Sequence, residues 1–182
     1  DRTLEVRHSG HLGDHHTTHN CSVARMSGSD WIFFKGMSSE QILGGRLRGD
    51  RNGLYEGISA EGDTTSLKAQ KLGIQAFTGP SAVSLGDEIC LFNSRRNKDD
   101  AGHVYADVYR IKADTGYELE HVSGAPISET TKHMNACSSN VAAIGMHDHR
   151  IGSVYFCAFV GGGTLNNGLT FLKLNTSDIY GT

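Results

Sequence analysis

The sequence has no excess of charge of one sign and no long apolar run. Its formal net charge is −3, and no stretch concentrates lysine or arginine, so we expect no nucleic-acid partner. No apolar run approaches the roughly 20 residues that a membrane-spanning helix needs, so we expect no membrane span. The chain begins at Asp1 with neither an initiator methionine nor an apolar signal segment, which indicates a processed mature chain.

Proline is scarce and helical patterning is weak, whereas glycine is abundant. The 182 residues include 2 prolines and 23 glycines, with serine, threonine and β-branched residues spread evenly. This composition is typical of many short strands joined by turns. The length fits one compact all-β domain, residues 1–182, or one subunit of a closed assembly.

A strand–turn–strand pattern about 60 residues long occurs three times along the chain. Valines at corresponding places in the copies are 60 and 58 residues apart: Val23, Val83 and Val141. After residues 1–20, the modules span residues 21–79, 80–136 and 137–182. Each hairpin is followed by a polar connection and a third strand, predicted at residues 53–58, 104–111 and 169–174. A fourth strand is predicted near residues 65–72 and 117–122.

The third module has no predicted fourth strand, but the N-terminus offers a matching segment. Residues 3–10 resemble residues 117–124 of the second module, and a strand taken from the opposite terminus is how a β-propeller removes its open edge. Propellers close with about four to eight blades. The fold class we predict is therefore three propeller-blade-like modules of four strands. Two such chains would close a six-bladed ring as a homodimer, in which Thr3–His8 of one completes the third blade of the other.

Three alternatives to this homodimer stay open. The first is a monomeric β-trefoil, which also has threefold internal symmetry. The second is one cleaved half of a larger propeller. The third is a ring completed by a second, different propeller chain.

The turn between the third and fourth strands carries a family resemblance. It reads Lys112-Ala113-Asp114-Thr115-Gly116-Tyr117-Glu118-Leu119 in the second module and Ser59-Ala60-Glu61-Gly62-Asp63-Thr64-Thr65-Ser66 in the first. Both resemble the Asp-box, Ser-x-Asp-x-Gly-x-Thr-Trp, of sialidase-like six-bladed propellers, although neither has the tryptophan. The resemblance implies a propeller, with a short polar side chain capping the turn and glycine supplying a positive φ. A kelch-like hairpin at residues 81–89 fits nearly as well.

The resemblance assigns no catalytic residue. Sialidases need an arginine cluster, a Tyr and Glu nucleophile pair and an Asp acid, and the Arg-Ile-Pro motif that brings the first arginine is absent here. If the chain is an enzyme, we expect a glycoside hydrolase of sialidase type assembled across two chains.

Long polar loops are predicted at equivalent places in the modules, at residues 46–52, 94–102 and 161–167. Sugar binding needs an apolar face and convergent polar groups, and repeated loops offer repeated sites. The candidate ligand-binding residues are Arg48, Asp50, Asn52, Arg95, Arg96, Asn97, Asn166 and Asn167. We therefore predict a lectin-like module that binds a glycan or glycoprotein. An adhesion protein that uses Arg48-Gly49-Asp50 is a further alternative.

Histidine is concentrated near the N-terminus, where half of the ten histidines fall within residues 8–19. Clustered imidazoles bind divalent metals when deprotonated. The candidate ligands are His11, His15, His16 and His19. A polar connection or a pH-sensitive interface is the alternative.

Sequons and cysteines indicate the secretory pathway. The two sequons predict glycosylation at Asn20 and Asn175. The four cysteines, Cys21, Cys90, Cys137 and Cys157, would form two disulfides with three connectivities. We therefore predict a secreted glycoprotein; the alternative is a cytosolic protein with four buried thiols.

Overall fold

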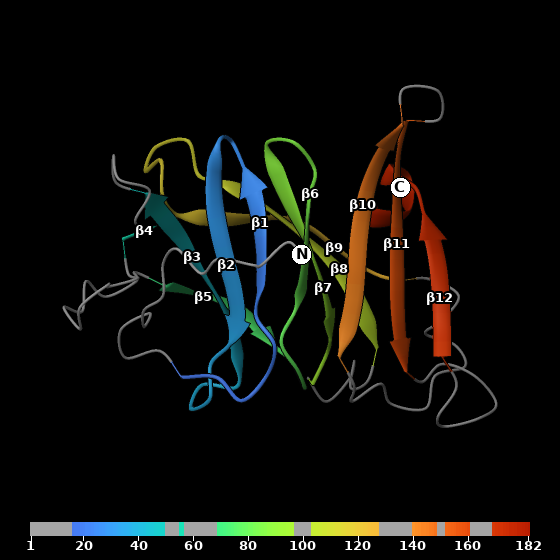
Figure 1. Cartoon of the computed structure of the whole chain (residues 1–182), viewed down its shortest axis with the longest axis horizontal. Coiled ribbons are helices and arrows are strands. Elements are labelled where there is room, and N and C mark those ends of the chain that lie inside the picture. The colour runs from blue at the N-terminus through green and yellow to red at the C-terminus, as the bar shows by residue number, and fades with distance from the viewer. Residues whose placement is uncertain are drawn as a thin grey trace, which may run out of the picture.

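Three antiparallel sheets stand side by side in the computed structural model (Figure 1), which describes residues 16–49, 55–56, 69–96, 103–127, 140–148, 152–160 and 169–182. Sheet one contains β1 (Ser22–Met26), β2 (Ser29–Lys35), β3 (Gln41–Gly49), β4 (Tyr55–Glu56) and β5 (Ala69–Gln75). Sheet two contains β6 (Ser81–Ser84), β7 (Glu88–Ser94), β8 (Val104–Ile111) and β9 (Leu119–Pro126). Sheet three contains β10 (Val141–Asp148), β11 (Gly152–Val160) and β12 (Leu169–Leu174).

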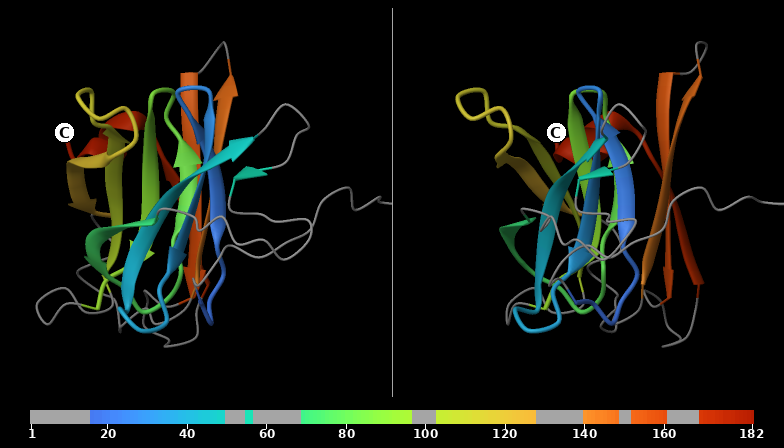
Figure 2. Two further views of the ribbon diagram at one scale, coloured as in Figure 1. Left: turned by 90° about the vertical axis from the view of Figure 1, so that its left-hand side faces the viewer. Right: turned by 60° about the vertical axis from the view of Figure 1, so that its left-hand side comes forward.

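The first strand of each sheet lies on the inside of the arrangement. Strands β1, β6 and β10 pack next to one another, and the sheets fan out from them (Figure 2). The Oγ of Ser22 accepts a hydrogen bond from the backbone N–H of Ala82 at 2.9 Å, and the Oγ of Ser81 accepts one from Ala143 at 2.9 Å. The prediction of propeller-like blades is confirmed. Since the described strands form separate sheets and no closed barrel, the β-trefoil alternative is wrong.

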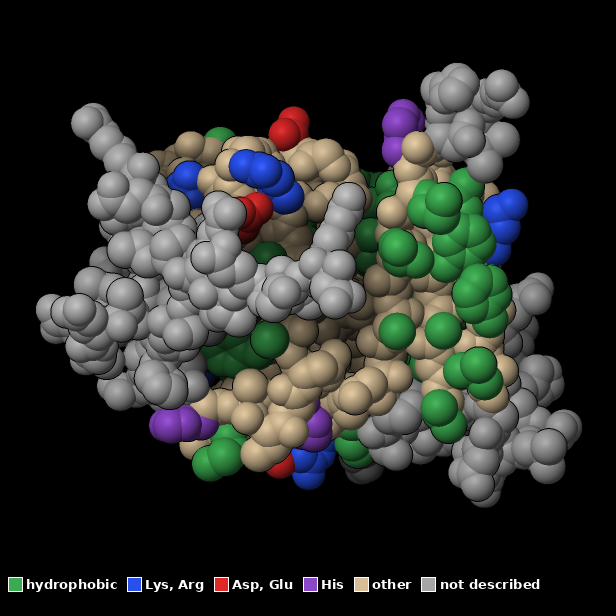
Figure 3. All heavy atoms as spheres, in the orientation of Figure 1, with side chains coloured by type: hydrophobic (Ala, Val, Ile, Leu, Met, Phe, Trp, Pro, Cys, Tyr) green, Lys and Arg blue, Asp and Glu red, His purple; other side chains and the backbone are tan. Residues whose placement is uncertain are grey.

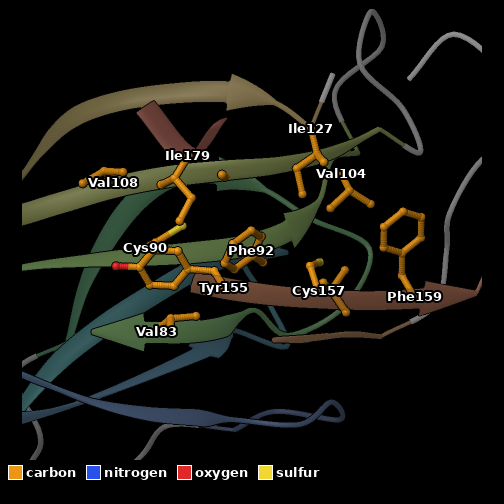
Figure 4. Close-up of a cluster of buried hydrophobic side chains, with 12 residues drawn as sticks. Val83, Cys90, Phe92, Val104, Val108, Ile127, Tyr155, Cys157, Phe159 and Ile179 are labelled. Carbon is orange, nitrogen blue, oxygen red and sulfur yellow. The ribbon is translucent and has the colours of Figure 1, made fainter. Parts of the chain in front are cut away.

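The core consists of two layers of side chains between the sheets. Trp31 and Phe33 of sheet one pack with Ile89 and Leu91 of sheet two. On the opposite side of sheet two, the second layer packs against sheet three (Figure 4); its members include Cys90, Phe92, Tyr155, Cys157 and Phe159. Sheet two is thus covered on both faces, which explains why β7 is an apolar run rather than an alternating strand.

In the first module, the predicted third strand is wrong. The structure forms the third strand, β3, from residues 41–49, and residues 55–56 of the predicted segment form β4, which pairs with the end of β3; the rest of that segment lies outside the described residues. The glycines of β3 are the reason: a Cβ at Gly44 would lie 2.8 Å from the Phe33 ring. Glycine here lets the strand approach an aromatic side chain and does not mark a loop.

Other strand predictions agree more closely with the structure. The third strands predicted at residues 104–111 and 169–174 are confirmed as β8 and β12. The fourth strands are β5, residues 69–75, and β9, residues 119–126; both end later than predicted, and residues 65–68 lie outside the described part of the chain. In the β8–β9 turn, Gly116 has a φ of 69° and the Thr115 Oγ1 accepts a hydrogen bond from the Glu118 N–H at 3.1 Å. The hydroxyl of Thr115 therefore caps this turn and Gly116 supplies the positive φ, as expected for a short polar side chain and a glycine at these places.

The segment after β12 forms a short helix, α2 (Thr176–Tyr180), rather than a strand. Asn175 caps it: its Oδ1 accepts a hydrogen bond from the Asp178 N–H at 2.9 Å, and Asp178 accepts one from the Asn175 N–H at 2.7 Å. Ile179 is fully buried and anchors α2 against β8, β9 and β11. Sheet three accordingly has three strands in the described part of the chain, and the predicted exchanged strand, Thr3–His8, lies outside that part. No described helix is long and apolar enough to cross a membrane.

The cysteines do not form the predicted pair of disulfides. Cys21 is an exposed free thiol and Cys90 a buried one. Cys157 lies in the same core layer as Cys90, and Cys137 is outside the described residues. Two bridges would need all four cysteines, so that framework does not form. Burial raises the pKa of the Cys90 thiol well above its usual value.

Candidate functional site

The connections after the second strands of sheets one and two lie at the same end of the molecule, which we call the basal end. Their described residues are 36–40, 95–96 and 103. The predicted loop at residues 46–52 is not equivalent to them, because residues 46–49 belong to β3 and end at the opposite end of sheet one. Of the candidate ligand-binding side chains, the structure describes Arg95 and Arg96. The Arg48 side chain, Asp50, Asn52, Asn97, Asn166 and Asn167 lie outside the described residues.

Arg95 is held by a carboxylate inside sheet two. Its Nη2 donates to both oxygens of Asp107, at 2.6 and 2.8 Å, and its guanidinium lies 4.5 Å from the centroid of the Tyr105 ring. Asp107 is fully buried and also accepts a hydrogen bond from the Asn93 Nδ2 at 2.7 Å. The Nε2 of His121 lies 3.0 Å from Asp107 Oδ1, and this imidazole is half exposed. We call these five residues the Arg95 cluster.

The backbone at Gly124 lies so close to the Arg95 cluster that it leaves no room for a side chain. A Cβ at this position would lie 2.6 Å from Asp107 Oδ1 and 3.0 Å from the Nε2 of His121. Two buried polar atoms of the cluster have no hydrogen-bond partner, Arg95 Nε and Asn93 Oδ1. A buried charge is stable only when it is paired and hydrogen-bonded. The cluster therefore fixes Arg95 in one orientation and leaves little of its guanidinium for a ligand.

Arg96, the next residue, reaches sheet one instead. Its backbone N–H donates to Gln75 O at 2.9 Å, and its guanidinium forms an ion pair with Glu40. The guanidinium also lies 5.9 Å from the centroid of the half-buried Phe77 ring. Both charged side chains are more than two fifths exposed, at 41% and 49%. We call Arg96, Glu40 and Phe77 the Arg96 site; it presents a donor group, an acceptor group and an apolar surface together.

A buried lysine borders the Arg96 site. The Nζ of Lys35 donates to the Phe77 carbonyl at 3.0 Å and lies 3.5 Å from the Nε2 of His19. Burial and the charge of Lys35 both lower the pKa of His19. An ammonium group next to this nitrogen opposes a metal cation there, because the two positive charges repel.

The predicted histidine metal site is only partly described. His16 and His19 are placed, whereas His11 and His15 lie outside the described residues. Among the residues that the structure places, no three side chains of His, Cys, Asp or Glu gather as a metal-binding group.

Most residues of the two sites were not predicted from sequence. Asp107 could have been found from the sequence, because it is a charged residue in the middle of an otherwise largely apolar strand. Glu40 and Phe77 gave none, because they are far from Arg96 in the sequence and each occurs in an ordinary turn or connection. Only the packing of sheet one on sheet two brings them together.

Comparison with solved structures supports the fold. The chain is similar to a fucose lectin from Kordia zhangzhouensis, solved in complex with methyl-fucoside, with a TM-score of 0.50, 10% identity, and coverage of 87% of this chain and 94% of that chain. It is also similar to an exo-β-1,3-galactanase from Clostridium thermocellum, with a TM-score of 0.46, 17% identity, and coverage of 87% of this chain and 32% of that chain. No protein-family model and no curated protein matches the chain. At this identity the lectin likeness establishes a propeller-type fold alone.

Proposed function

We propose that the chain is a secreted lectin-like module and that the Arg96 site binds its glycan. The observation that carries the proposal is the ion pair of Arg96 and Glu40 beside the Phe77 ring. A guanidinium donates up to five hydrogen bonds and a carboxylate accepts several, so an exposed pair can bind two neighbouring sugar hydroxyls. The aromatic ring offers the apolar surface that a sugar ring needs.

The rigid surroundings of the Arg96 site support this role. Arg96 follows Arg95, whose guanidinium is fixed by the buried Asp107, and the Arg96 backbone is hydrogen-bonded to sheet one. A preorganised site loses less conformational entropy when its ligand binds. The similarity of the fold to a lectin that binds a fucoside is consistent with the proposal.

The experiment is a glycan array probed with the full chain and with two variants. Arg96→Ala and Glu40→Gln should each weaken the best signal about tenfold or more, which corresponds to about 1.4 kcal/mol. Arg110→Ala is the matched control, because Arg110 forms a similar exposed pair with Glu120 on sheet two. Absence of binding to any glycan, or equal losses in all three variants, would refute the assignment.

The other predicted functions stay predictions. A fluorogenic sialoside assay tests the glycoside hydrolase of sialidase type. An adhesion assay with Asp50→Glu tests the Arg48-Gly49-Asp50 reading, whose side chains the structure does not describe. Within the described residues, no observation favours either function over sugar binding.

We also propose that two copies of the chain pair and that the protein is glycosylated. Pairing would place at least two sugar sites in one particle, which multiplies weak affinities through effective concentration. Asn20 and Asn175 are both exposed, so an oligosaccharide can be attached at either position. Mass spectrometry of the protein secreted from a eukaryotic host tests the two glycosylation sites.

A further inference from the structure

Sheet three has one covered face and one bare face, and both are apolar. The covered face packs on sheet two through Tyr155, Cys157 and Phe159. The strand registers place the alternate residues of β10, β11 and β12 on the other face. That face contains Ala142, Ile144, Met146, Asp148, Gly152, Val154, Phe156, Ala158, Val160, Leu169, Phe171 and Lys173. We call it the outer face of sheet three; nine of these twelve residues are apolar.

The outer face of sheet three is exposed in the single chain. Leu169 is 74% exposed, Phe171 63% and Ile144 60%. The space-filling view shows hydrophobic side chains gathered over β10, β11 and β12 (Figure 3). A contiguous apolar surface of this kind usually marks an interface in a soluble protein. A sheet that is apolar on both faces is likewise typical of one that is covered on both.

The internal repeat indicates what covers this face. One face of sheet one packs on sheet two, and one face of sheet two packs on sheet three. The side chains of β2, β7 and β11 alternate between the two faces of their sheets in the same way. The outer face of sheet three therefore corresponds to the face with which sheet one packs on sheet two, and sheet two on sheet three. The surface that would receive it is the far side of sheet one, meaning the face of sheet one that points away from sheet two. On that face Val23 is 55% exposed, whereas Ile32, Phe34, Leu43 and Leu47 form an apolar cluster that is already buried in the single chain.

The inner strands contribute a polar element to the same series. Ser22 and Ser81 stand at the start of β1 and β6, and each hydrogen-bonds through its hydroxyl to the inner strand of the following sheet. In sheet three the corresponding residue is Ala142, so this hydroxyl contact is not repeated on the outer face.

We propose that the outer face of sheet three docks on the far side of sheet one of a second copy of this chain. Two such contacts, related by a twofold axis, close a ring of six sheets. The inference rests on the proposed pairing and deepens it by naming both surfaces.

The first experiment is the solution mass of the full chain by light scattering and sedimentation. The wild type should be a dimer, twice the 19.6 kDa of one chain. Phe171→Glu and Leu169→Glu should be monomeric with an unchanged circular dichroism spectrum, because both side chains are exposed in the single chain. Val122→Glu on β9 of the middle sheet is the matched control and should stay a dimer.

Cross-linking between lysines identifies the partner surface. Lys173 lies on the outer face of sheet three, and Lys71, opposite Leu43 in the register of β3 and β5, lies on the far side of sheet one. In a mixture of isotopically light and heavy chains, cross-links from Lys173 to Lys71 between copies are expected. Links from Lys173 to Lys173 between copies would mean that two outer faces pack on each other and would overturn the choice of sheet one.

The outcomes separate the two proposals. A monomeric wild type would overturn both the pairing and the docking surface. A dimer that survives both glutamate substitutions would leave pairing intact and overturn the docking surface. In either case the glycan array reports on the Arg96 site independently, because that site lies within a single chain.

Discussion

Asp107 is a buried carboxylate that depends on its neighbours for stability. Arg95, Asn93 and His121 surround its two oxygens. Removing one member of a buried ion pair leaves the other charge without compensation. We therefore predict that Asp107→Asn lowers the free energy of unfolding by about 3–5 kcal/mol, measured by urea denaturation. Asp114→Asn, at an exposed position of the β8–β9 turn, is the control and should change it by less than about 0.5 kcal/mol.

A second prediction at the residue scale concerns Gly124. In Gly124→Ala the new Cβ would lie 2.6 Å from Asp107 Oδ1, so the strand or the carboxylate must shift. We expect a loss of about 1–3 kcal/mol of stability. Ser123→Ala is the neighbouring control: the Ser123 hydroxyl is buried without a hydrogen-bond partner, so its removal should be nearly neutral or stabilising. Equal effects of the two substitutions would contradict the close approach at Gly124.

Tyr109 gives the protein a pH dependence. Its hydroxyl donates to Leu72 O at 3.0 Å, and burial followed by the charge of Asp107 raises its pKa above the usual 10.0. The folded state thus keeps a proton that the unfolded state loses above pH 10. Stability from this group is present below pH 10 and falls as pH rises, by up to about 1.4 kcal/mol per pH unit. Tyr109→Phe should reduce the slope in urea titrations from pH 8 to 11, whereas Tyr117→Phe, at an exposed position, should leave it unchanged. The buried Cys90 thiol, whose pKa is also raised, contributes to the slope that remains.

At the scale of elements, the short helix α2 is stabilised by its ends. Helix α2 has a complete capping box at Asn175 and Asp178, and a left-handed residue, Gly181, at its end. We predict that Asn175→Ala lowers stability by about 1 kcal/mol, measured on unglycosylated protein. Thr176→Ala, one residue further, should have little effect. If both substitutions are neutral, the helix is held by Ile179 alone.

The elements also show where sequence patterns sufficed and where they failed. Strands β8 and β12 were predicted with correct bounds, because their apolar and polar residues give a clear strand pattern. Strand β3 was missed, because its paired glycines resemble a loop. The reason for a glycine in this strand appears only in the structure, where the ring of Phe33 occupies the space that a side chain at Gly44 would need.

At the scale of the whole molecule, the two end sheets have different neighbours from the middle one. Sheet two is covered on both sides, while the outer face of sheet three is bare in the single chain. Pairing through this face would bury the exposed surfaces of Phe171 and Leu169. Each buried apolar Å² contributes roughly 25 cal/mol, less the entropy lost on association.

The sequence by itself determined the threefold repeat and the all-β class, because a period of about 60 residues and strand alternation are local properties of the chain. It also brought Arg95 and Arg96 to attention as polar loop residues. Only the tertiary structure decided that Arg95 is held by Asp107 while Arg96 meets Glu40 and Phe77. Those contacts join residues from different sheets or strands, and their geometry depends on how sheet packs on sheet. The bare face of sheet three is known for the same reason: burial is a property of neighbours, which no strand pattern specifies.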